Sequence, residues 1–311
     1  LSKSGKANTI DDLIGEFWGS EIDELEENVR KIKIVDPACG SGAFLNKASD
    51  VLLEIHQAMH EQRYKEDKSL IPFIDNIEER RKILLDNIFG VDLNEESVEI
   101  TKLSLFLKVC KEGLKLPNLD NNIKCGNSLI DDPRYTDKPF NWEENFKKIF
   151  EDGGFDIVIG NPPYVRMEKI KDIKPFLKRN YVTYSGRSDL YVYFFEKGLN
   201  VLKDNGMFSF ICSDKFIKAK YGKALRNFIL DYSFLKYVNY TTDHTGKKVF
   251  EDTTTYPCVT VIKKTHPKSD SKIVVNESFE ILQSKLDSHT WNLEPSHILD
   301  LKEKVYSSSI R

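Results

Sequence analysis

Two consecutive prolines, Pro162 and Pro163, place a rigid loop directly after an apolar segment of this chain. Proline fixes φ and lacks a backbone N–H, so the segment Asn161–Tyr164 continues neither a helix nor a strand. The preceding segment, Phe155–Gly160, has the composition of a buried strand. Open α/β sheets bind their ligands in loops at the carboxyl ends of strands. The sequence therefore predicts an α/β fold with a binding site at this loop.

The polar groups of the loop indicate the kind of ligand. Asn161 offers a side-chain carbonyl, Pro162 offers a backbone carbonyl, and Tyr164 offers a flat ring. Two acceptors and a stacking ring suit a planar group with an amino substituent, such as an adenine drawn out of a duplex. Asn-Pro and Pro-Pro are also ordinary turn signals, so the loop alone leaves both interpretations open.

Composition limits the class of protein. The 311 residues are 40% hydrophobic and 31% charged, which is typical of a globular protein. The net charge of −3 requires any nucleic-acid contact to come from local patches. The five cysteines form no Cys-x-x-Cys pair, and we expect free thiols in a reducing cytosol. We find no signal peptide and no apolar run near the ~20 residues of a membrane span. The chain starts with Leu, and we expect a fragment of a longer protein.

Three further segments lead to polar residues at their ends. The apolar ones are Ile32–Asp36 and Ile88–Asp92, and Asn122–Cys125 is predicted as a third short strand. The first is followed by a small-residue turn, 37–43, and then a helix, which is typical of a nucleotide cradle. Asp36 at this strand end would repel phosphates and favours a cationic or neutral ligand such as S-adenosylmethionine. Asp92 can accept hydrogen bonds from ribose hydroxyls, and Asn127 is expected level with both aspartates.

Apolar periodicity predicts the remaining elements. Helices are expected within 8–29, from Leu45 to Met59, and within 77–85, 95–110, 142–150, 189–202 and 224–234. In the helix capped by Asn94, the predicted inner stripe is Val98, Leu103, Leu107 and Cys110. Further strands are expected at 206–211, 235–241 and 258–262, the last two forming a hairpin. The total is seven strands. Residues 266–311 lack this apolar periodicity and resemble a linker into another unit.

Basic residues gather in two stretches after the proline loop. The DNA-contact candidates among them are Arg166, Lys169, Lys171, Lys174, Lys178, Arg179, Lys215, Lys218 and Lys220. A run of charges is ordinarily a solvated face. Beside a loop shaped for a flipped base, contact with DNA phosphates is the better interpretation.

With these residues in place, the chain resembles the γ-class N6-adenine DNA methyltransferases of bacterial restriction–modification systems, in particular the type IIG-like proteins. Residues 36–45 look like the first cofactor motif, 90–93 like the second and 125–129 like the third. Residues 161–164 look like the Asn-Pro-Pro-Tyr catalytic motif, and 189–191 and 249–252 match later landmarks. The third motif often has Asp where this chain has Asn127.

The resemblance implies a Rossmann-like sheet of seven strands between helices, with the last strand antiparallel and inserted between the fifth and sixth. It implies S-adenosylmethionine as cofactor and no metal. The implied cofactor-binding residues are Asp36, Ala38, Cys39, Gly40, Gly42, Phe44, Asp92, Leu93, Asn127 and Ser128. The implied catalytic residues are Asn161, Pro162, Pro163 and Tyr164, with Tyr164 and Phe250 stacking on the target base.

The implied function is methyl transfer to N6 of a flipped-out adenine in double-stranded DNA. The catalytic domain would span 1–265, and 266–311 would begin a target-recognition region. A nuclease or specificity domain is a possible neighbour in the full-length chain. Alternatives are a protein-glutamine N5-methyltransferase, a cytosine-N4 methyltransferase and a non-catalytic DNA-specificity subunit.

Overall fold

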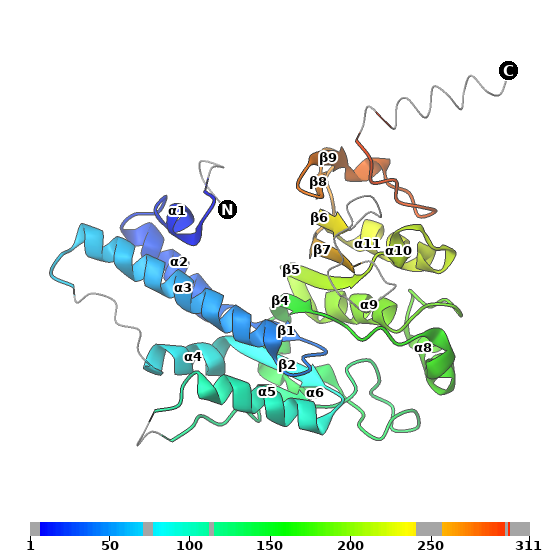
Figure 1. Cartoon of the computed structure of the whole chain (residues 1–311), viewed down its shortest axis with the longest axis horizontal. Helices are drawn as coiled ribbons and strands as arrows, with labels where there is room; N and C mark the ends of the chain where they lie inside the picture. The colour runs from blue at the N-terminus through cyan, green and yellow to red at the C-terminus, as the bar shows by residue number, and fades with distance from the viewer. Residues whose placement is uncertain (1–6, 71–76, 112–114, 241–256, 296–297, 299–311) are drawn as a thin grey trace.

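One mixed sheet between helices forms the protein (Figure 1). The computed structural model describes residues 7–70, 77–111, 115–240, 257–295 and 298. In these residues nine strands follow the order β3-β2-β1-β4-β5-β7-β6-β8-β9. The strands are β1 (Ile34–Asp36), β2 (Ile88–Asp92), β3 (Ile123–Cys125), β4 (Phe155–Gly160), β5 (Leu202–Ser213), β6 (Phe234–Tyr240), β7 (Pro257–Lys263), β8 (Lys272–Val275) and β9 (Phe279–Leu282).

The first five strands are parallel, and β7 is antiparallel to both of its neighbours, β5 and β6. The expected insertion of an antiparallel strand between the fifth and sixth is therefore confirmed, as is the hairpin of β6 and β7. The expected total of seven strands is too low, because β8 pairs in parallel with β6 and β9 pairs with β8. Four parallel strands, β3-β2-β1-β4, present their carboxyl ends along one edge.

The helices occupy both faces of the sheet. They are α1 (Ile10–Ile14), α2 (Ser20–Lys31), α3 (Ala43–Glu66), α4 (Ile77–Asn87), α5 (Glu95–Leu107), α6 (Trp142–Asn145), α7 (Lys147–Glu151), α8 (Lys174–Asn180), α9 (Tyr191–Val201), α10 (Lys215–Lys218) and α11 (Lys223–Tyr232), with short 3-10 turns η1 (Met167–Ile173), η2 (Lys220–Gly222) and η3 (Gln283–Lys285). The helix expected within 8–29 is two helices. The first is capped by Thr9, whose side chain accepts a hydrogen bond from Asp12 N.

Alternating residues of the strands pack into two separate hydrophobic cores. In β1, Ile34 joins the core under α2–α5, whereas Val35 joins the core shared with α6, α7, α9 and α11. Ile88 and Phe89 of β2 divide in the same way. Successive side chains of a strand point to opposite faces. Figure 1 shows α3 and α9 on opposite sides of the sheet accordingly. No described helix is long and apolar enough to cross a membrane.

The predicted inner stripe of α5 is wrong at three of its four positions. Leu103 is 58% exposed and Leu107 is 69% exposed, whereas Val98, Thr101 and Leu105 are buried. The inner face carries a polar residue because the Thr101 hydroxyl donates to Gly40 O at 2.7 Å. An apolar count therefore missed this face. Cys110, which was also predicted for the inner stripe, lies beyond the end of α5, and its thiol is exposed.

The segment after residue 265 was expected to resemble a linker, and its described part packs onto the fold. The buried Gln283 side chain accepts from Leu235 N at 2.8 Å and donates to Ser233 O at 2.9 Å. The buried Arg226 side chain donates to Ser288 O at 3.0 Å and also to His289 O. Fully buried Trp291 meets the Phe216 ring at a centroid distance of 5.8 Å. Residues 296–297 and 299–311 lie outside the described residues.

Candidate functional site

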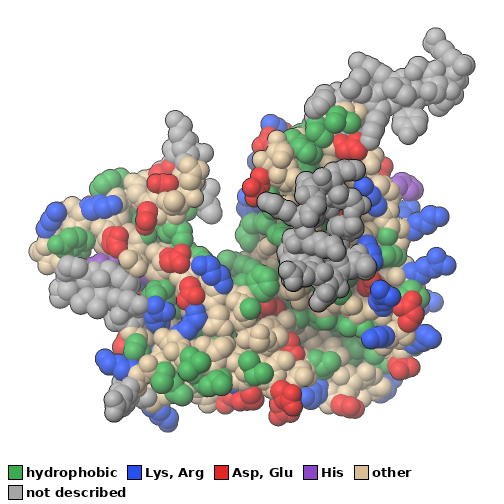
Figure 2. Space-filling view, in the orientation of Figure 1, with side chains coloured by type: hydrophobic (Ala, Val, Ile, Leu, Met, Phe, Trp, Pro, Cys, Tyr) green, Lys and Arg blue, Asp and Glu red, His purple; other side chains and the backbone are tan. Residues whose placement is uncertain are grey.

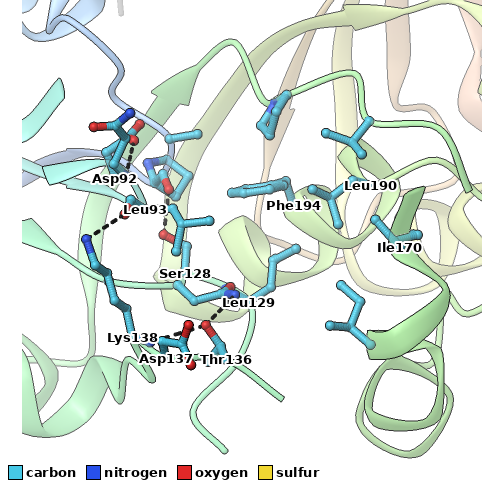
Figure 3. A pocket seen from close by; sticks show the side chains of 18 of the residues that line it. Asp92, Leu93, Ser128, Leu129, Thr136, Asp137, Lys138, Ile170, Leu190 and Phe194 are labelled. Carbon is cyan, nitrogen blue, oxygen red and sulfur yellow. Dashed lines mark hydrogen bonds between the residues drawn. The ribbon is translucent and has the colours of Figure 1, made fainter. Parts of the chain in front are cut away.

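A cavity of about 1380 Å³ runs along the carboxyl ends of the four parallel strands β3, β2, β1 and β4. Its wall includes Ala38 after β1, Asp92 at the end of β2, Asn127 after β3 and Asn161 after β4. Parallel strands end at the same edge of a sheet, which is why segments so distant in sequence meet here. Figure 3 shows part of this wall around Asp92, Leu93 and Ser128.

The turn between β1 and α3 depends on two glycines in left-handed conformations. Gly40 has φ 54° and Gly42 has φ 82°, a region that residues with a Cβ rarely adopt. A Cβ on Gly42 would also lie 2.8 Å from Thr101 Cγ2. The turn therefore needs glycine at position 42 for both conformation and space, and it packs closely against α5.

Asp92 connects the turn after β1 with the turn after β2. Its Oδ2 accepts from Gly40 N at 2.8 Å, and its Oδ1 accepts from Asn94 N at 2.9 Å. The adjacent Leu93 side chain is 54% exposed although it is large and apolar. A fixed carboxylate beside an open apolar surface suits a ligand that combines hydroxyl groups with a flat ring.

Asp36 lies beneath the proline loop and is only 1% exposed. Burial raises the pKa of its carboxyl to about 7. The negative charge of Asp92 also raises this pKa. The Ala38 N–H donates a hydrogen bond to the Asp36 carboxyl at 2.9 Å and lowers the pKa. A Cβ on Gly160 would lie 2.5 Å from Asp36 Oδ1, so the end of β4 and this carboxyl are in direct contact. Asp36 supports the site from below and is absent from the cavity wall.

The turn after β3 forms hydrogen bonds to the turn after β1 and to a loop at the mouth of the cavity. The buried Ser128 hydroxyl donates to Pro37 O at 2.5 Å. Asn127 N donates to Lys138 O at 2.8 Å, and Asn127 Nδ2 lies 3.3 Å from Thr136 Oγ1. These bonds hold the loop 133–138, which forms part of the cavity wall (Figure 3).

The proline loop presents Asn161 and Pro163 to the cavity, whereas Pro162 is buried. Within the described residues, the Asn161 carboxamide makes no hydrogen bond. The Tyr164 ring is 41% exposed, and its hydroxyl donates to Ile211 O of β5 at 3.2 Å. The hydroxyl is thus fixed while one part of the ring stays open.

An apolar wall faces the cofactor-motif residues, and the sequence analysis did not assign it to the site. It consists of Val165, Ile170, Ile173, Leu190 and Phe194. Figure 3 shows Phe194 between the group around Asp92 and the group formed by Leu190 and Ile170. The available signal was the landmark 189–191, which places the start of α9 beside the proline loop.

The structure divides the predicted site residues into two sets. Ala38, Gly40, Asp92, Leu93, Asn127, Ser128, Asn161 and Pro163 line the cavity. Asp36, Cys39, Gly42, Phe44, Pro162 and Tyr164 do not line it. Cys39 is a buried core residue, and burial raises the pKa of its thiol. Phe250 and the landmark 249–252 lie outside the described residues.

The basic residues lie on η1, α8, α10 and η2, apart from Arg166, which directly precedes η1. Figure 2 shows Lys and Arg side chains along the side of the molecule where α8 and α10 are located. Two of the nine candidates have contacts within the protein: Arg179 Nη2 lies 3.5 Å from Asp132 Oδ2, and Lys174 Nζ donates to Gly186 O. The other seven are exposed. Among the described residues, no cluster of His, Cys, Asp and Glu could hold a metal ion.

The strand order, with β7 antiparallel between β5 and β6, and the cavity at the strand ends match the Rossmann-like methyltransferase sheet that the sequence analysis expected. Residues 86–250 match the family model "Eco57I restriction-modification methylase", and the chain belongs to this family.

Two curated relatives are similar over most of this chain. The type II restriction enzyme and methyltransferase RM.Eco57I of Escherichia coli is 30% identical over 89% of the chain, which covers 30% of that protein. The type II methyltransferase M.BstVI of Geobacillus stearothermophilus is 31% identical over 96% of the chain, which covers 49% of that protein. The chain thus spans about half or less of the length of these relatives.

Solved structures support the fold. The type IIL restriction–modification enzyme MmeI, in complex with DNA, has a TM-score of 0.58 at 15% identity, over 85% of this chain and 36% of the MmeI chain. A nuclease-deletion mutant of the type ISP enzyme LlaGI, with a DNA substrate mimic, has a TM-score of 0.56 at 17% identity, over 81% of this chain and 22% of that chain.

Proposed function

We propose that this chain transfers a methyl group from S-adenosylmethionine to N6 of an adenine that has left a DNA duplex. The observation that supports this most directly is the position of Asn161. Its carboxamide, without a hydrogen bond among the described residues, borders the same cavity as Asp92 and Leu93. A group that has no internal partner is available to a ligand.

The size of the cavity supports two ligands side by side. Pockets for a single small molecule usually have volumes of roughly 300–1,000 Å³. The cavity of about 1380 Å³ therefore has room for a cofactor and a planar base. Transfer between two bound groups requires that they meet in one space, and this arrangement provides it.

The chain's residues fit S-adenosylmethionine at the β1–β3 side. The acidic residues of the cavity wall, Asp92, Glu95, Glu96 and Asp137, outnumber the two basic ones, Arg134 and Lys138. The local charge therefore favours a cationic cofactor and disfavours phosphates. The Asp92 carboxylate can hold ribose hydroxyls, and Leu93 and Phe194 can pack on the two faces of a purine. S-adenosylmethionine supplies an electrophilic methyl group when bound.

At the β4 side, Asn161 would act on the exocyclic amino group of the target. Its side-chain oxygen and the Pro162 carbonyl would accept the two amino hydrogens, which directs the nitrogen lone pair toward the methyl group. Moving a base out of the stack costs a few kcal/mol, and stacking on Tyr164 returns about 1–3 kcal/mol. Catalysis by positioning and hydrogen bonding needs no nucleophilic side chain.

The partner in this proposal is double-stranded DNA in the bacterial cytoplasm, approached through the basic residues on η1, α8, α10 and η2. Residues 1–265 would contain the catalytic elements. The segment from 266 onward would lead into a target-recognition region, with its first part, up to Leu293, packed on the catalytic fold.

The test compares three versions of the longest natural polypeptide that contains this chain: wild type, Asn161→Ala and Asn118→Ala. Asn118 is an exposed residue outside the cavity wall and serves as the control. Each is incubated with methyl-labelled S-adenosylmethionine and unmethylated DNA, which is then digested to nucleosides for mass spectrometry. Label in N6-methyladenine is expected for wild type and the control. Asn161→Ala should lose at least about 10²-fold in rate while its cofactor affinity is retained.

Other outcomes separate the alternatives. Label in N4-methylcytosine would show that the target atom is N4 of cytosine instead of N6 of adenine. Label in protein glutamine would support the protein-methyltransferase alternative. A protein that shows no saturable cofactor binding would support a specificity subunit with a vestigial cofactor fold.

A further inference from the structure

Three tyrosines connect the proline loop to the second group of basic residues. The Tyr164 and Tyr191 rings meet edge to face at a centroid distance of 6.3 Å. The hydroxyl groups of Tyr191 and Tyr221 lie 3.1 Å apart. Tyr221 belongs to η2, directly after the exposed Lys220. The three residues therefore span the distance between the Tyr164 ring and a candidate phosphate-contact surface.

The hydroxyl pair is more than packing. Tyr191 is fully buried, and its side chain would fill the same space if it were phenylalanine. Burying a hydroxyl group costs free energy unless it is hydrogen-bonded, and Tyr221 supplies the bond. Burial raises the pKa of Tyr191 well above its usual range and raises that of Tyr221 to about 12, so both groups keep their protons at neutral pH.

The start of α9 is attached to the proline loop at two further points. Leu190 N donates to Val165 O at 2.9 Å, and Met167 N donates to Asp189 Oδ1 at 3.3 Å. These bonds flank Tyr191 in sequence. A displacement of Tyr191 is therefore passed to the backbone that follows Tyr164.

The other end of the connection is also rigid. Buried Arg226 donates to Ala219 O at 3.0 Å and to Phe216 O, which fixes the backbone around α10 and η2. A Cβ on Gly222 would lie 2.2 Å from Phe216 O, so this turn packs without spare room. Lys215, Lys218 and Lys220 project from this fixed backbone.

We propose that Tyr191 and Tyr221 are positioning residues that couple phosphate contact at Lys215, Lys218 and Lys220 to the orientation of the Tyr164 ring. The proposal rests on the proposed function, in which Tyr164 stacks on the flipped base. Neither Tyr191 nor Tyr221 lines the cavity. Their hydrogen bond sets the angle of the ring that receives the base once DNA is held.

The test removes single hydroxyl groups and keeps the rings. Tyr191→Phe and Tyr221→Phe each delete the same hydrogen bond, and the double variant deletes both partners. Tyr237→Phe is the matched control, because its hydroxyl bonds Glu277, which lies on neither α9 nor η2. The measurements are kcat at saturating DNA and cofactor, the fluorescence of 2-aminopurine at the target position, and the salt dependence of DNA affinity.

We expect each single variant to lower kcat about 3–10-fold and to reduce the 2-aminopurine signal of the unstacked base. DNA affinity and its salt dependence should stay within about twofold of wild type, because no phosphate contact is removed. The double variant should be no worse than either single variant, since all three lack one shared bond. The control should match wild type.

Wild-type kcat and fluorescence in both single variants, or additive losses in the double variant, would overturn the coupling. A drop in thermal stability with unchanged kcat would assign the pair a structural role only, and also overturns it. If one single variant does not fold, the other deletes the same bond and decides the test. Failure of the proposed function gives a different result, namely no methyl transfer to adenine by the wild type.

Discussion

At the scale of single residues, Asp36 has the largest change in pKa among the carboxyl groups of the described residues. Its pKa is about 7 in the folded protein, against an ordinary value of 3.8. Between these values the folded state binds more protons than the unfolded state. The stabilising contribution is therefore complete below about pH 4 and is lost as the pH rises through 7.

This difference predicts the pH dependence of stability. In urea unfolding of the ligand-free protein, the wild type should lose on the order of a few kcal/mol between pH 5 and pH 8 from this group. Asp36→Asn, which is neutral throughout, should lack that component. Parallel stability curves for the two proteins across this range would contradict the assignment.

The sequence indicated which residue types lie at the strand ends but not what each side chain touches. Asp92 and Asn127 reach the cavity wall, whereas Asp36 points to a buried position under Gly160. All three follow strands in the same way in the sequence. Their different exposure depends on the neighbouring strand, and β4 lies about 120 residues away from β1 along the chain. No local pattern reports on that neighbour.

At the scale of elements, α5 offers a direct test of its orientation. Leu105 is 1% exposed, whereas Leu107 is 69% exposed. Leu105→Ala should lower the free energy of unfolding by about 2–5 kcal/mol, because it leaves a cavity in the core. Leu103→Ala and Leu107→Ala should change it by less than about 0.5 kcal/mol. Urea unfolding of the three variants checks this, and the reverse order would restore the stripe that the sequence suggested.

The sequence predicted that most helices and strands exist, but it predicted less well which other elements they pack against. The strands β1, β2, β4 and β5 follow from short apolar runs, and Asn94 marks the start of α5 with its side-chain bond to Glu96 N. The strands β8 and β9 were missed because each is four residues long and includes charged residues. Their pairing with β6 is a tertiary effect that short-range propensity does not encode.

At the scale of the whole molecule, the sheet continues past the expected boundary at residue 265. A chain shortened to residue 265 loses β8 and β9, the Gln283 bonds and buried Trp291. It also exposes the edge of β6, which favours aggregation. A chain ending at residue 295 keeps all of these contacts.

We therefore expect the chain ending at 265 to give a lower thermal unfolding midpoint and less soluble protein than the chain ending at 295. Trp291→Ala in the longer chain should cost about 3–5 kcal/mol of unfolding free energy. Differential scanning calorimetry and gel filtration measure both effects. Equal midpoints for the two lengths would show that the catalytic fold ends where the sequence analysis placed it.

The undivided cavity at the strand ends also has a consequence for inhibitor chemistry. A compound that tethers an adenosine to a second purine could occupy the Leu93 side and the Asn161 side at once. A short tether makes the second contact intramolecular, with an effective concentration in the mM range. Affinity would then rise steeply with a tether of fitting length and fall again with a longer one, so a tether series would measure the separation of the two ligands in solution.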